Sequence, residues 1–348
     1  MKKLAILTSG GDCPGLNAVI RAVVMRAAAH DAEVMGIRGG WRGLVTGETE
    51  KLTRAGVDHI LNQGGTILGI SRFSPYHVPN GPQRLVQNFK DWNLHGLIAV
   101  GGEGTLTLAN RLHTEFGVPV VGVPKTIDND VGATEETFGF DTAVSIATDA
   151  IDRLRTTAEA HERVMVVEVM GRHAGWIAAA AGLAGGAELI LVPEKPVALK
   201  DVIDTVKRWH RGKRVSSLIV VAEGALVQTS SEGPADLILA SSAKDTMGRP
   251  RLGGVGAFLA AAIEQQTGVE TRVTVLGHVQ RGGTPTARDR ILATRLGVYA
   301  ADLCGEGRFG TMAALKAGQI VAVTLEEAIR EKKLLDPALY QVASTFFE

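Results

Sequence analysis

The stretch Gly122 to Asp130 reads GVPKTIDND and leads from an apolar run into a polar turn. The run, Val118 to Val123, is typical of a strand buried inside a sheet. After the proline, Thr126, Asp128 and Asp130 occupy alternate positions, and alternate side chains of an extended chain share a face. Open α/β sheets bind ligands at the carboxyl ends of their strands. The stretch therefore predicts a hydroxyl and two carboxylates in a ligand site, although an acidic turn that merely closes a strand also fits.

Two glycine-rich turns follow other apolar runs. Lys3 to Ser9 predicts a strand, after which GGDCPGLNA leads into a helix expected from Leu16 to Ala29. His95 to Val100 predicts another strand, followed by GGEGTLTLANRL, with Glu103 between glycines and Thr105 at an expected helix N-cap. Such turns bring free N–H groups and the positive end of a helix dipole to an anion. Either turn could be purely structural, but together they favour phosphate binding, with Glu103 as a ligand for Mg²⁺.

Arginine residues gather in segments that follow or precede expected strands. Arg72 is the last residue but one of NQGGTILGISRF, Arg163 precedes the strand expected at Val164 to Val169, and Arg172 lies in MGRHAGW. Arg272 begins an expected strand, and GHVQRGGTPTARDR places His278, Arg281, Arg288 and Arg290 in one expected loop. Guanidinium groups bind phosphate oxygens bidentately. Early carboxylates and later arginines predict one lobe for a nucleotide and a metal, and another that holds an anionic substrate.

Apolar runs alternate with amphipathic segments along the chain, which predicts an α/β fold with doubly wound, mainly parallel sheets. A helix is expected from Asp141 to His161, where apolar residues recur at helical spacing. GGWRGL after Ile37 is expected to be a loop. Residues 225–252 are polar and irregular, and are expected to form an insertion or a lid-like loop.

The composition excludes several classes of protein. Of the 348 residues 45% are hydrophobic, which is enough to build two lobes. Lys plus Arg equals Asp plus Glu, at 37 each, so no basic field favours nucleic acid or anionic membrane. Cys13 and Cys304 form no disulfide framework or zinc pattern. Because no signal peptide or membrane span of about 20 apolar residues is found, we expect a cytoplasmic protein.

Five motifs together make the sequence resemble the 6-phosphofructokinases nearly end to end. They are SGGDCPGLNA, GGEGT, PKTIDND, MGRHAGW and LGHVQRGGTP, in the order and spacing of that family. The resemblance implies Mg²⁺-dependent transfer of a phosphoryl group to the 1-hydroxyl of fructose 6-phosphate, which gives fructose 1,6-bisphosphate in glycolysis. It also implies two α/β lobes with the active site in the cleft between them. Residues 1–139 with about 279–325 would hold the donor, and about 140–278 with 326–348 the sugar phosphate.

Carried over position by position, the resemblance implies that Asp128 is the general base and that Thr126 and Asp130 steady the reactants. Arg172 would stabilise charge on the transferring phosphoryl group. The donor site would comprise Gly11, Arg72, Phe73, Gly102, Glu103, Gly104 and Thr105, with Glu103 as the metal ligand. The sugar-phosphate pocket would comprise Thr126, Asp128, Arg163, Met170, Gly171, Arg172, Glu223, Arg272, His278 and Arg281. In the family, Arg163 and Arg272 reach a neighbouring subunit's pocket, which implies at least a dimer and usually a homotetramer.

Two positions bear on the identity of the phosphoryl donor. Members of the family that use ATP usually have glycine at the positions of both Gly104 and Lys125, whereas members that use pyrophosphate usually have aspartate and lysine there. An aspartate at position 104 would crowd and repel the α-phosphate of ATP, while Lys125 can neutralise a phosphate without excluding ATP. We therefore expect ATP as the donor, with pyrophosphate as the alternative. Glu103 is one methylene longer than the family's usual aspartate, so Mg²⁺ can sit differently or bind through water.

Other interpretations of the same motifs explain less. GGEGT also resembles a turn of NAD kinases and lipid kinases, but these do not account for PKTIDND and QRGG. A non-catalytic regulatory subunit that binds sugar phosphate should have lost a carboxylate among Asp128, Asp130 and Glu103. An effector site could include Arg21, Arg54, Arg155 and Glu188, but Met25 stands where a further arginine is usual. Trp41 and Phe73 are candidates for stacking on adenine.

Overall fold

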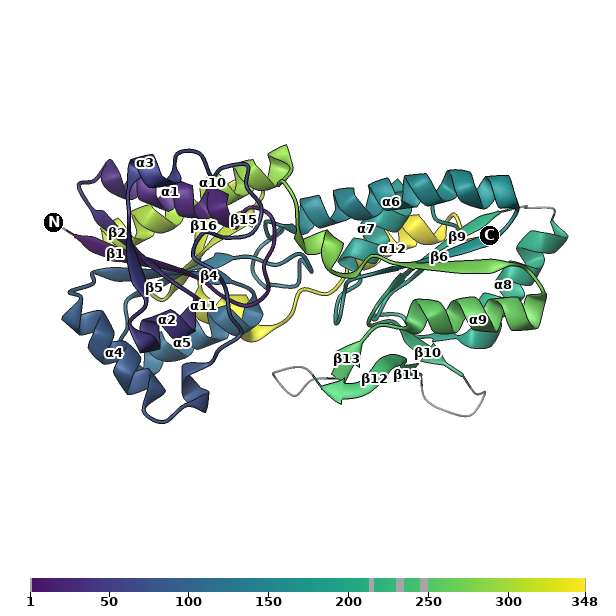
Figure 1. The fold of residues 1–348 in the computed structure, drawn as a ribbon, viewed down its shortest axis with the longest axis horizontal. Coiled ribbons are helices and arrows are strands. Elements are labelled where there is room, and N and C mark those ends of the chain that lie inside the picture. Colours follow the sequence, from purple (N-terminus) through teal and green to yellow (C-terminus); the bar gives the residue numbers. More distant parts are fainter. Residues whose placement is uncertain (1, 213–215, 230–234, 245–249, 348) are drawn as a thin grey trace. The chain divides into compact units, whose positions relative to one another are not determined.

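The computed structural model consists of two compact units (Figure 1). It describes residues 2–212, 216–229, 235–244 and 250–347. The first unit comprises residues 1–142 and 281–333, and the second comprises residues 143–280 and 334–348. The chain therefore passes from the first unit to the second for the last time after Lys333, and not after residue 325 as the resemblance implied. The reason is that α11 (Leu325–Arg330) packs on α5 (Glu103–Phe116) of the first unit, which keeps residues 326–333 there.

The first unit is built on a seven-stranded sheet of order β16-β15-β5-β4-β1-β2-β3. Its strands are β1 (Lys3–Thr8), β2 (Glu33–Ile37), β3 (Thr49–Leu52), β4 (Gly96–Gly101), β5 (Val120–Pro124), β15 (Thr311–Lys316) and β16 (Gln319–Thr324). The five central strands are parallel, and each edge strand is antiparallel to its neighbour. Because the chain leaves β1 for β2 on one side and later adds β4 on the other, the strand order reverses between β1 and β4. Ligands of open α/β sheets bind at such a point.

Helices cover both faces of this sheet (Figure 1). On one face α1 (Leu16–Ala28) packs against α10 (Ala287–Glu306), and the other face carries α2 (Trp41–Thr46), α4 (Gly81–Asp91), α5 and α11. In α5 the buried positions Leu106, Ala109 and Leu112 recur at helical spacing and join the apolar core. The short elements α3 (Arg54–Val57) and η1 (Pro75–His77) complete the unit.

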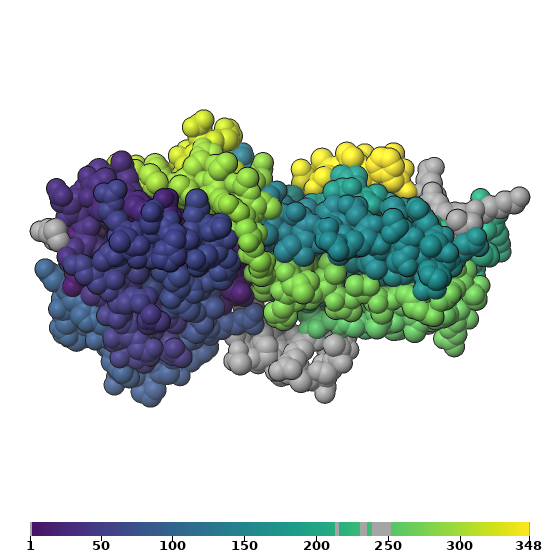
Figure 2. Space-filling model, turned by 45° about the horizontal axis from the view of Figure 1, so that its top comes forward, coloured from purple at the N-terminus to yellow at the C-terminus, as the bar shows by residue number. Residues whose placement is uncertain are grey.

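The second unit is built on a four-stranded parallel sheet of order β14-β6-β9-β7. Its strands are β6 (Val164–Val169), β7 (Leu189–Leu191), β9 (Ser217–Ala222) and β14 (Thr271–Val275). One face carries α6 (Phe140–His161), α7 (Trp176–Ala184) and α12 (Pro337–Ser344), and the other carries α8 (Leu199–Arg211) and α9 (Val255–Thr267). Figure 2 shows α6 in teal at the surface of this unit. None of the helices in the described ranges is long and apolar enough to cross a membrane.

Several segments differ from the sequence expectations. GGWRGL contains the start of α2, because the buried side chains of Trp41 and Leu44 fix a short helix against the core despite its glycine. Residues 225–252 contain the short strands β10 (Leu226–Gln228), β11 (Asp236–Leu237), β12 (Leu239–Lys244) and β13 (Pro250–Leu252), with β8 (Val197–Ala198) pairing with β10. The rest of the expected lid-like insertion, residues 230–234 and 245–249, lies outside the described residues.

Two helices begin earlier than expected. Thr286 is the N-cap of α10 and its side chain accepts a hydrogen bond from the Asp289 N–H, so Arg288 and Arg290 lie in the first turn of a helix and not in a loop. The segment that holds His278 and Arg281 is instead a 3-10 turn, η2 (Gly277–Arg281). Helix α5 begins at Glu103 with Gly102 as its N-cap, so Thr105 lies inside the first turn.

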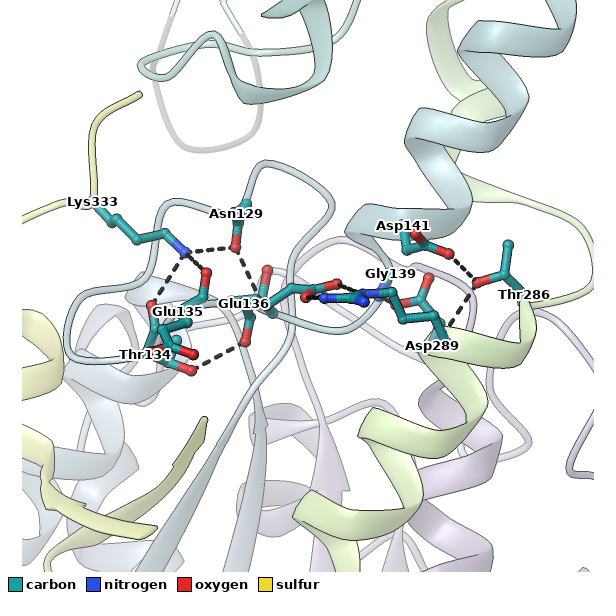
Figure 3. A network of polar contacts seen from close by, with 11 residues as sticks. Asn129, Thr134, Glu135, Glu136, Gly139, Asp141, Thr286, Asp289 and Lys333 are labelled. Carbon is teal, nitrogen blue, oxygen red and sulfur yellow. Dashed lines mark hydrogen bonds and ion pairs between the residues drawn. The ribbon is translucent and has the colours of Figure 1, made fainter. Parts of the chain in front are cut away.

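The buried carboxylate of Asp289 holds together two segments of the first unit, each of which lies near a point where the chain passes from one unit to the other. Asp289 is fully buried, and its carboxylate accepts a hydrogen bond from the N–H of Gly139 at 2.8 Å (Figure 3). It also accepts from the N–H of Thr142 at 2.8 Å and from the Thr142 hydroxyl at 2.5 Å. Beside it, Arg288 pairs with Glu136 at 2.5 Å. Burial raises the pKa of Asp289 to about 6, because a buried carboxylate loses its hydration. The start of α10 is thereby tied to the end of the loop that follows β5.

Replacing Asp289 with asparagine is expected to lower the free energy of unfolding by about 1 to 3 kcal/mol at pH 7.5. An amide offers one acceptor oxygen, so in either orientation at least one buried N–H of Gly139 or Thr142 faces another donor. Urea unfolding followed by circular dichroism measures the difference. Asp58→Asn is the control, because the exposed Arg21–Asp58 pair at 3.2 Å should contribute less than about 1 kcal/mol. Equal unfolding midpoints for the two variants would contradict this assignment.

Candidate active site

Three turns of the first unit follow the carboxyl ends of the adjacent parallel strands β1, β4 and β5. Gly10, Gly11 and Asp12 follow β1, residues 102–105 follow β4, and residues 125–130 follow β5. A Cβ atom added at Gly10 would lie 3.5 Å from Lys125 Nζ and 3.6 Å from Thr105 Oγ1. The structure thus brings the two glycine turns and the PKTIDND segment together at one edge of the sheet.

The PKTIDND segment is a turn and not an extended chain. Asn129 has a positive φ of 52°, a conformation that asparagine adopts more readily than most residues, and the Asp128 N–H donates to Thr126 Oγ1 at 3.1 Å. The extended conformation expected for Thr126 to Asp130 is therefore wrong. The side chains nevertheless alternate between buried and partly exposed. Ile127 and Asn129 are buried, whereas Thr126, Asp128 and Asp130 are partly exposed. The three polar side chains all reach the surface, through turn geometry.

Two cations lie at the first glycine turn. The side chain of Lys125 is 2% exposed, and its Nζ donates to the carbonyl of Gly11. Arg281 donates to the carbonyl of Asp12 at 3.2 Å, and its Nε is buried with no hydrogen-bond partner among the described residues. Burial lowers the pKa of Lys125 to about 8, and the positive charge of Arg281 acts in the same direction. The carboxylates of Asp12 and Asp128 act in the opposite direction on this pKa, but the two neighbouring cations together suit an anion such as a phosphate. Arg281, expected in the sugar-phosphate pocket, therefore also flanks the donor turn.

The segments that follow β4 and β5 carry the carboxylates Glu103, Asp128 and Asp130, which give this part of the site an excess of negative charge. Burial and the neighbouring Asp128 carboxylate raise the pKa of Asp130 to about 6, and Glu103 acts in the same direction. Within the described residues no three His, Cys, Asp or Glu side chains are placed to hold a metal by themselves. Carboxylate oxygens are nevertheless the ligands that Mg²⁺ prefers, and Mg²⁺ in phosphoryl-transfer sites commonly has one or two carboxylates, with water and phosphate oxygens completing its shell. Glu103 and Asp130 fit such a site.

The remaining donor-site candidates differ in their surroundings. The backbone of the first glycine turn donates to the carbonyl of Ser71 at 3.1 Å, which places Arg72 and the half-buried Phe73 in the segment beside it. A Cβ atom at Gly104 would meet no atom within 4 Å, so this position has open space around it. Trp41 is 1% exposed and lies in the apolar core, so its assignment to adenine stacking is wrong.

The second unit presents polar residues at the carboxyl ends of its own adjacent strands. Met170, Gly171 and Arg172 follow β6, Glu223 follows β9, and His278 follows β14. Glycine is required at position 224, because a Cβ atom there would collide with the carbonyl of Arg172. The buried amide of Gln280 accepts a hydrogen bond from the Met170 N–H at 3.3 Å and so supports this edge. Sequence reasoning did not single out Gln280, although it lies within the QRGG motif.

Arg163 and Arg272 lie at the opposite end of the same sheet. Arg163 immediately precedes β6, and Arg272 is the second residue of β14, so both are at the amino end. Both guanidinium groups bind Oε1 of Glu270, at 3.2 Å and 2.7 Å respectively. A six-residue strand spans about 20 Å, so Arg163 and Arg172 of one chain cannot contact the same phosphate.

The residues of the suggested effector site are divided between the units. Arg21 belongs to the first unit, where it binds Asp58. Arg155 belongs to the second unit, where it pairs with Glu188 at 3.2 Å and donates to the carbonyls of Gly185 and Gly186. These contacts join α6 to the segment between α7 and β7, which gives Arg155 a structural role in its own unit.

Comparison with known proteins identifies the family. The family model for phosphofructokinase matches residues 3–304. A pyrophosphate–fructose 6-phosphate 1-phosphotransferase of Amycolatopsis methanolica is 54% identical over 346 residues, which cover 99% of each chain. An ATP-dependent 6-phosphofructokinase of Mycobacterium tuberculosis is 49% identical over 348 residues, again 99% of each. The structure of phosphofructokinase from Saccharomyces cerevisiae superposes with a TM-score of 0.82 at 31% identity, over 99% of this chain and 47% of that one.

These matches confirm the resemblance seen in the five sequence motifs, and they confirm the expected α/β fold with mainly parallel sheets. Relatives that carry the two different donors in their names lie close together in identity, so family membership by itself leaves the donor open. The chain belongs to the phosphofructokinase family of phosphotransferases.

Proposed function

We propose that the chain is a pyrophosphate-dependent 6-phosphofructokinase that phosphorylates the 1-hydroxyl of fructose 6-phosphate in the presence of Mg²⁺. The observation that carries this proposal is the separation of charge in the first unit. Lys125 and Arg281 lie at the first glycine turn, whereas Glu103, Asp128 and Asp130 lie on the two neighbouring turns. A complex of Mg²⁺ with a phosphate donor carries both signs of charge and complements both groups.

The residues of the first unit have the properties that phosphoryl transfer requires. Asp128 is the general base that takes the proton from the sugar 1-hydroxyl, and its backbone N–H is fixed by the Thr126 hydroxyl at 3.1 Å. Glu103 and Asp130 would hold Mg²⁺, and the chemistry it would supply is neutralisation of charge on the donor's phosphate oxygens. Lys125 and Arg281 bind those oxygens from the side of the first glycine turn. Positioning and charge neutralisation account for most catalysis of this type.

Two observations favour pyrophosphate over the ATP donor expected from Gly104. Three relatives named as pyrophosphate-dependent are 52 to 54% identical over nearly the whole chain and a fourth is 45% identical, whereas four named as ATP-dependent are 48 to 49% identical. Lys125, the residue typical of pyrophosphate-using members, is buried with its ammonium at the first glycine turn, where it can bind a terminal phosphate. ATP is the second candidate, because the open space at Gly104 leaves room for an α-phosphate.

The sugar phosphate is assigned to residues of the second unit. Met170, Gly171, Arg172, Glu223 and His278 follow neighbouring strand ends and would bind it, with Arg172 also stabilising the transferring phosphoryl group. Arg163 and Arg272 lie at the opposite end of that sheet, so in this proposal they serve the pocket of a neighbouring subunit. The active protein is then a homo-oligomer, at least a dimer, and a tetramer is the state usual in the family.

Initial rates of fructose 1,6-bisphosphate formation test the assignment. The purified protein is assayed with fructose 6-phosphate and Mg²⁺, and with either pyrophosphate or ATP as the second substrate. We expect turnover with pyrophosphate and a kcat/KM for ATP at least about ten times lower. Turnover with ATP alone would show that Gly104 decides the donor. The absence of turnover with both donors would contradict the enzyme assignment and favour a non-catalytic subunit that binds sugar phosphate.

A further inference from the structure

The short segment Glu331–Lys333, which follows α11, is docked by its backbone on the turn that carries the catalytic carboxylates. The Lys333 N–H donates to the carbonyl of Asp130 at 3.1 Å, and the Gly132 N–H donates to the carbonyl of Ala328 at 3.2 Å. A Cβ atom at Gly132 would lie 2.6 Å from the carbonyl oxygen of Glu331. Glycine at position 132 therefore permits this close approach of the two segments.

The side chain of Lys333 anchors the same loop from within. Its Nζ donates to Asn129 Oδ1 at 2.7 Å and to the carbonyls of Thr134 and Glu135 at 3.1 and 2.7 Å (Figure 3). Asn129 Oδ1 also accepts from the Thr137 N–H at 3.1 Å. The left-handed residue between Asp128 and Asp130 is thus held by a lysine from the far end of the chain.

Lys332, the residue before Lys333, lies beside the carboxylate of Glu103. Lys332 Nζ lies 3.6 Å from Glu103 Oε2, and both side chains are about one-third exposed, at 36% and 38%. The positive charge of Lys332 also lowers the pKa of Asp130, whereas the Asp128 and Glu103 carboxylates raise it. The backbone contacts of Glu331–Lys333 fix where the Lys332 side chain starts, so this ammonium is directed at the carboxylate group by the fold.

We propose that Lys332 is a further positioning residue of the phosphoryl-transfer site, whose ammonium neutralises Glu103 and disfavours bare Mg²⁺ relative to the complex of Mg²⁺ with the donor. The inference rests on the proposed function for the nature of that complex. A free dication is repelled by an ammonium group at the same carboxylate, whereas magnesium pyrophosphate carries net negative charge and is attracted to it. Lys332 thereby couples entry of the metal to entry of the donor.

Binding of Mn²⁺ to the protein without substrates tests this role directly. Electron paramagnetic resonance of free Mn²⁺, which stands in for Mg²⁺, gives the dissociation constant. We expect Lys332→Met to bind Mn²⁺ about three to ten times more tightly than the wild type, and Lys332→Arg to restore wild-type affinity. Lys51→Met is the matched control and should bind Mn²⁺ as the wild type does, because Lys51 forms an exposed pair with Glu33 at 2.5 Å on the edge of the same sheet.

A second readout separates positioning from a purely structural role. In steady-state assays of Lys332→Met, the KM for the magnesium–donor complex should rise about five-fold while the KM for fructose 6-phosphate stays within about two-fold. Circular dichroism confirms folding, and Lys332→Gln serves as a second uncharged variant. Wild-type Mn²⁺ affinity in both folded, uncharged variants would overturn the proposal. The Mn²⁺ titration contains no donor, so it tests Lys332 even if the donor proves to be ATP.

Discussion

Replacing Asp128 with asparagine is expected to lower kcat by about 10²- to 10⁴-fold, which is the range that a positioned general base contributes. Asparagine has the same shape but cannot accept the proton of the sugar 1-hydroxyl. The substitution leaves the local turn intact, because the contact with Thr126 is made by the backbone N–H of residue 128. The loss should therefore appear in the chemical step, and the dissociation constant of fructose 6-phosphate should change by less than about three-fold.

Stopped-flow or steady-state assays of fructose 1,6-bisphosphate formation measure kcat, and calorimetric titration with fructose 6-phosphate measures binding. Asp91→Asn is the matched control, since Asp91 is an exposed residue of α4 that accepts a hydrogen bond from Gln87. It should leave kcat unchanged. Full activity of the Asp128→Asn variant would contradict the assignment of the base, and loss of sugar-phosphate binding would point to a structural role instead.

Replacing Lys125 with methionine is expected to lower kcat/KM for pyrophosphate by about 10- to 100-fold, which corresponds to the loss of a hydrogen bond from a charged group. Methionine fills a similar volume at this position, which is 2% exposed, but it carries no charge for a phosphate oxygen. Burial lowers the pKa of Lys125 to about 8, because the ammonium loses its hydration. Its removal should therefore weaken donor binding with little change in the free energy of unfolding, because relief from burying the ammonium offsets the loss of its hydrogen bond to the Gly11 carbonyl.

The measurement is the dependence of the initial rate on pyrophosphate at saturating fructose 6-phosphate, together with the thermal unfolding midpoint. Lys90→Met, on the exposed side of α4, provides a control for the loss of one lysine charge. Unchanged kcat/KM for pyrophosphate in Lys125→Met would contradict a role for this lysine at the donor. A lowered unfolding midpoint would show that the ammonium bound to the Gly11 carbonyl is structural.

The central strands and their turns could be predicted from the sequence because each signal is local. Val164 to Val169 is predicted with the bounds that the structure has, since a continuous apolar run is typical of a fully buried parallel strand. Glycines directly after β1 and β4 likewise indicated turns that leave backbone N–H groups free. The carboxyl ends of parallel strands lie at one edge of a sheet. The predicted α/β fold therefore also implied that these turns lie near one another.

The parts that were mispredicted depend on tertiary contacts. GGWRGL contains glycine and no helical signal of its own, but burial of Trp41 makes it the start of a helix. The turn at Asn129 is held by Lys333, which is 204 residues away in the chain, so an extended segment was the natural inference from alternate polar residues. Lys332 meets Glu103 across a similar separation, and no motif or spacing in the sequence relates the two residues.

A competition between the two donors in one solution distinguishes a pyrophosphate-dependent enzyme from an ATP-dependent one. The protein is incubated with fructose 6-phosphate, Mg²⁺ and equal concentrations of pyrophosphate and ATP, and phosphorus NMR follows each donor over time. We expect the pyrophosphate signal to decline as fructose 1,6-bisphosphate and inorganic phosphate appear, while the three ATP signals persist. Consumption of ATP with formation of ADP, while pyrophosphate remains, would contradict the assignment of pyrophosphate as the donor. It would indicate that Gly104, and not Lys125, determines which donor is used.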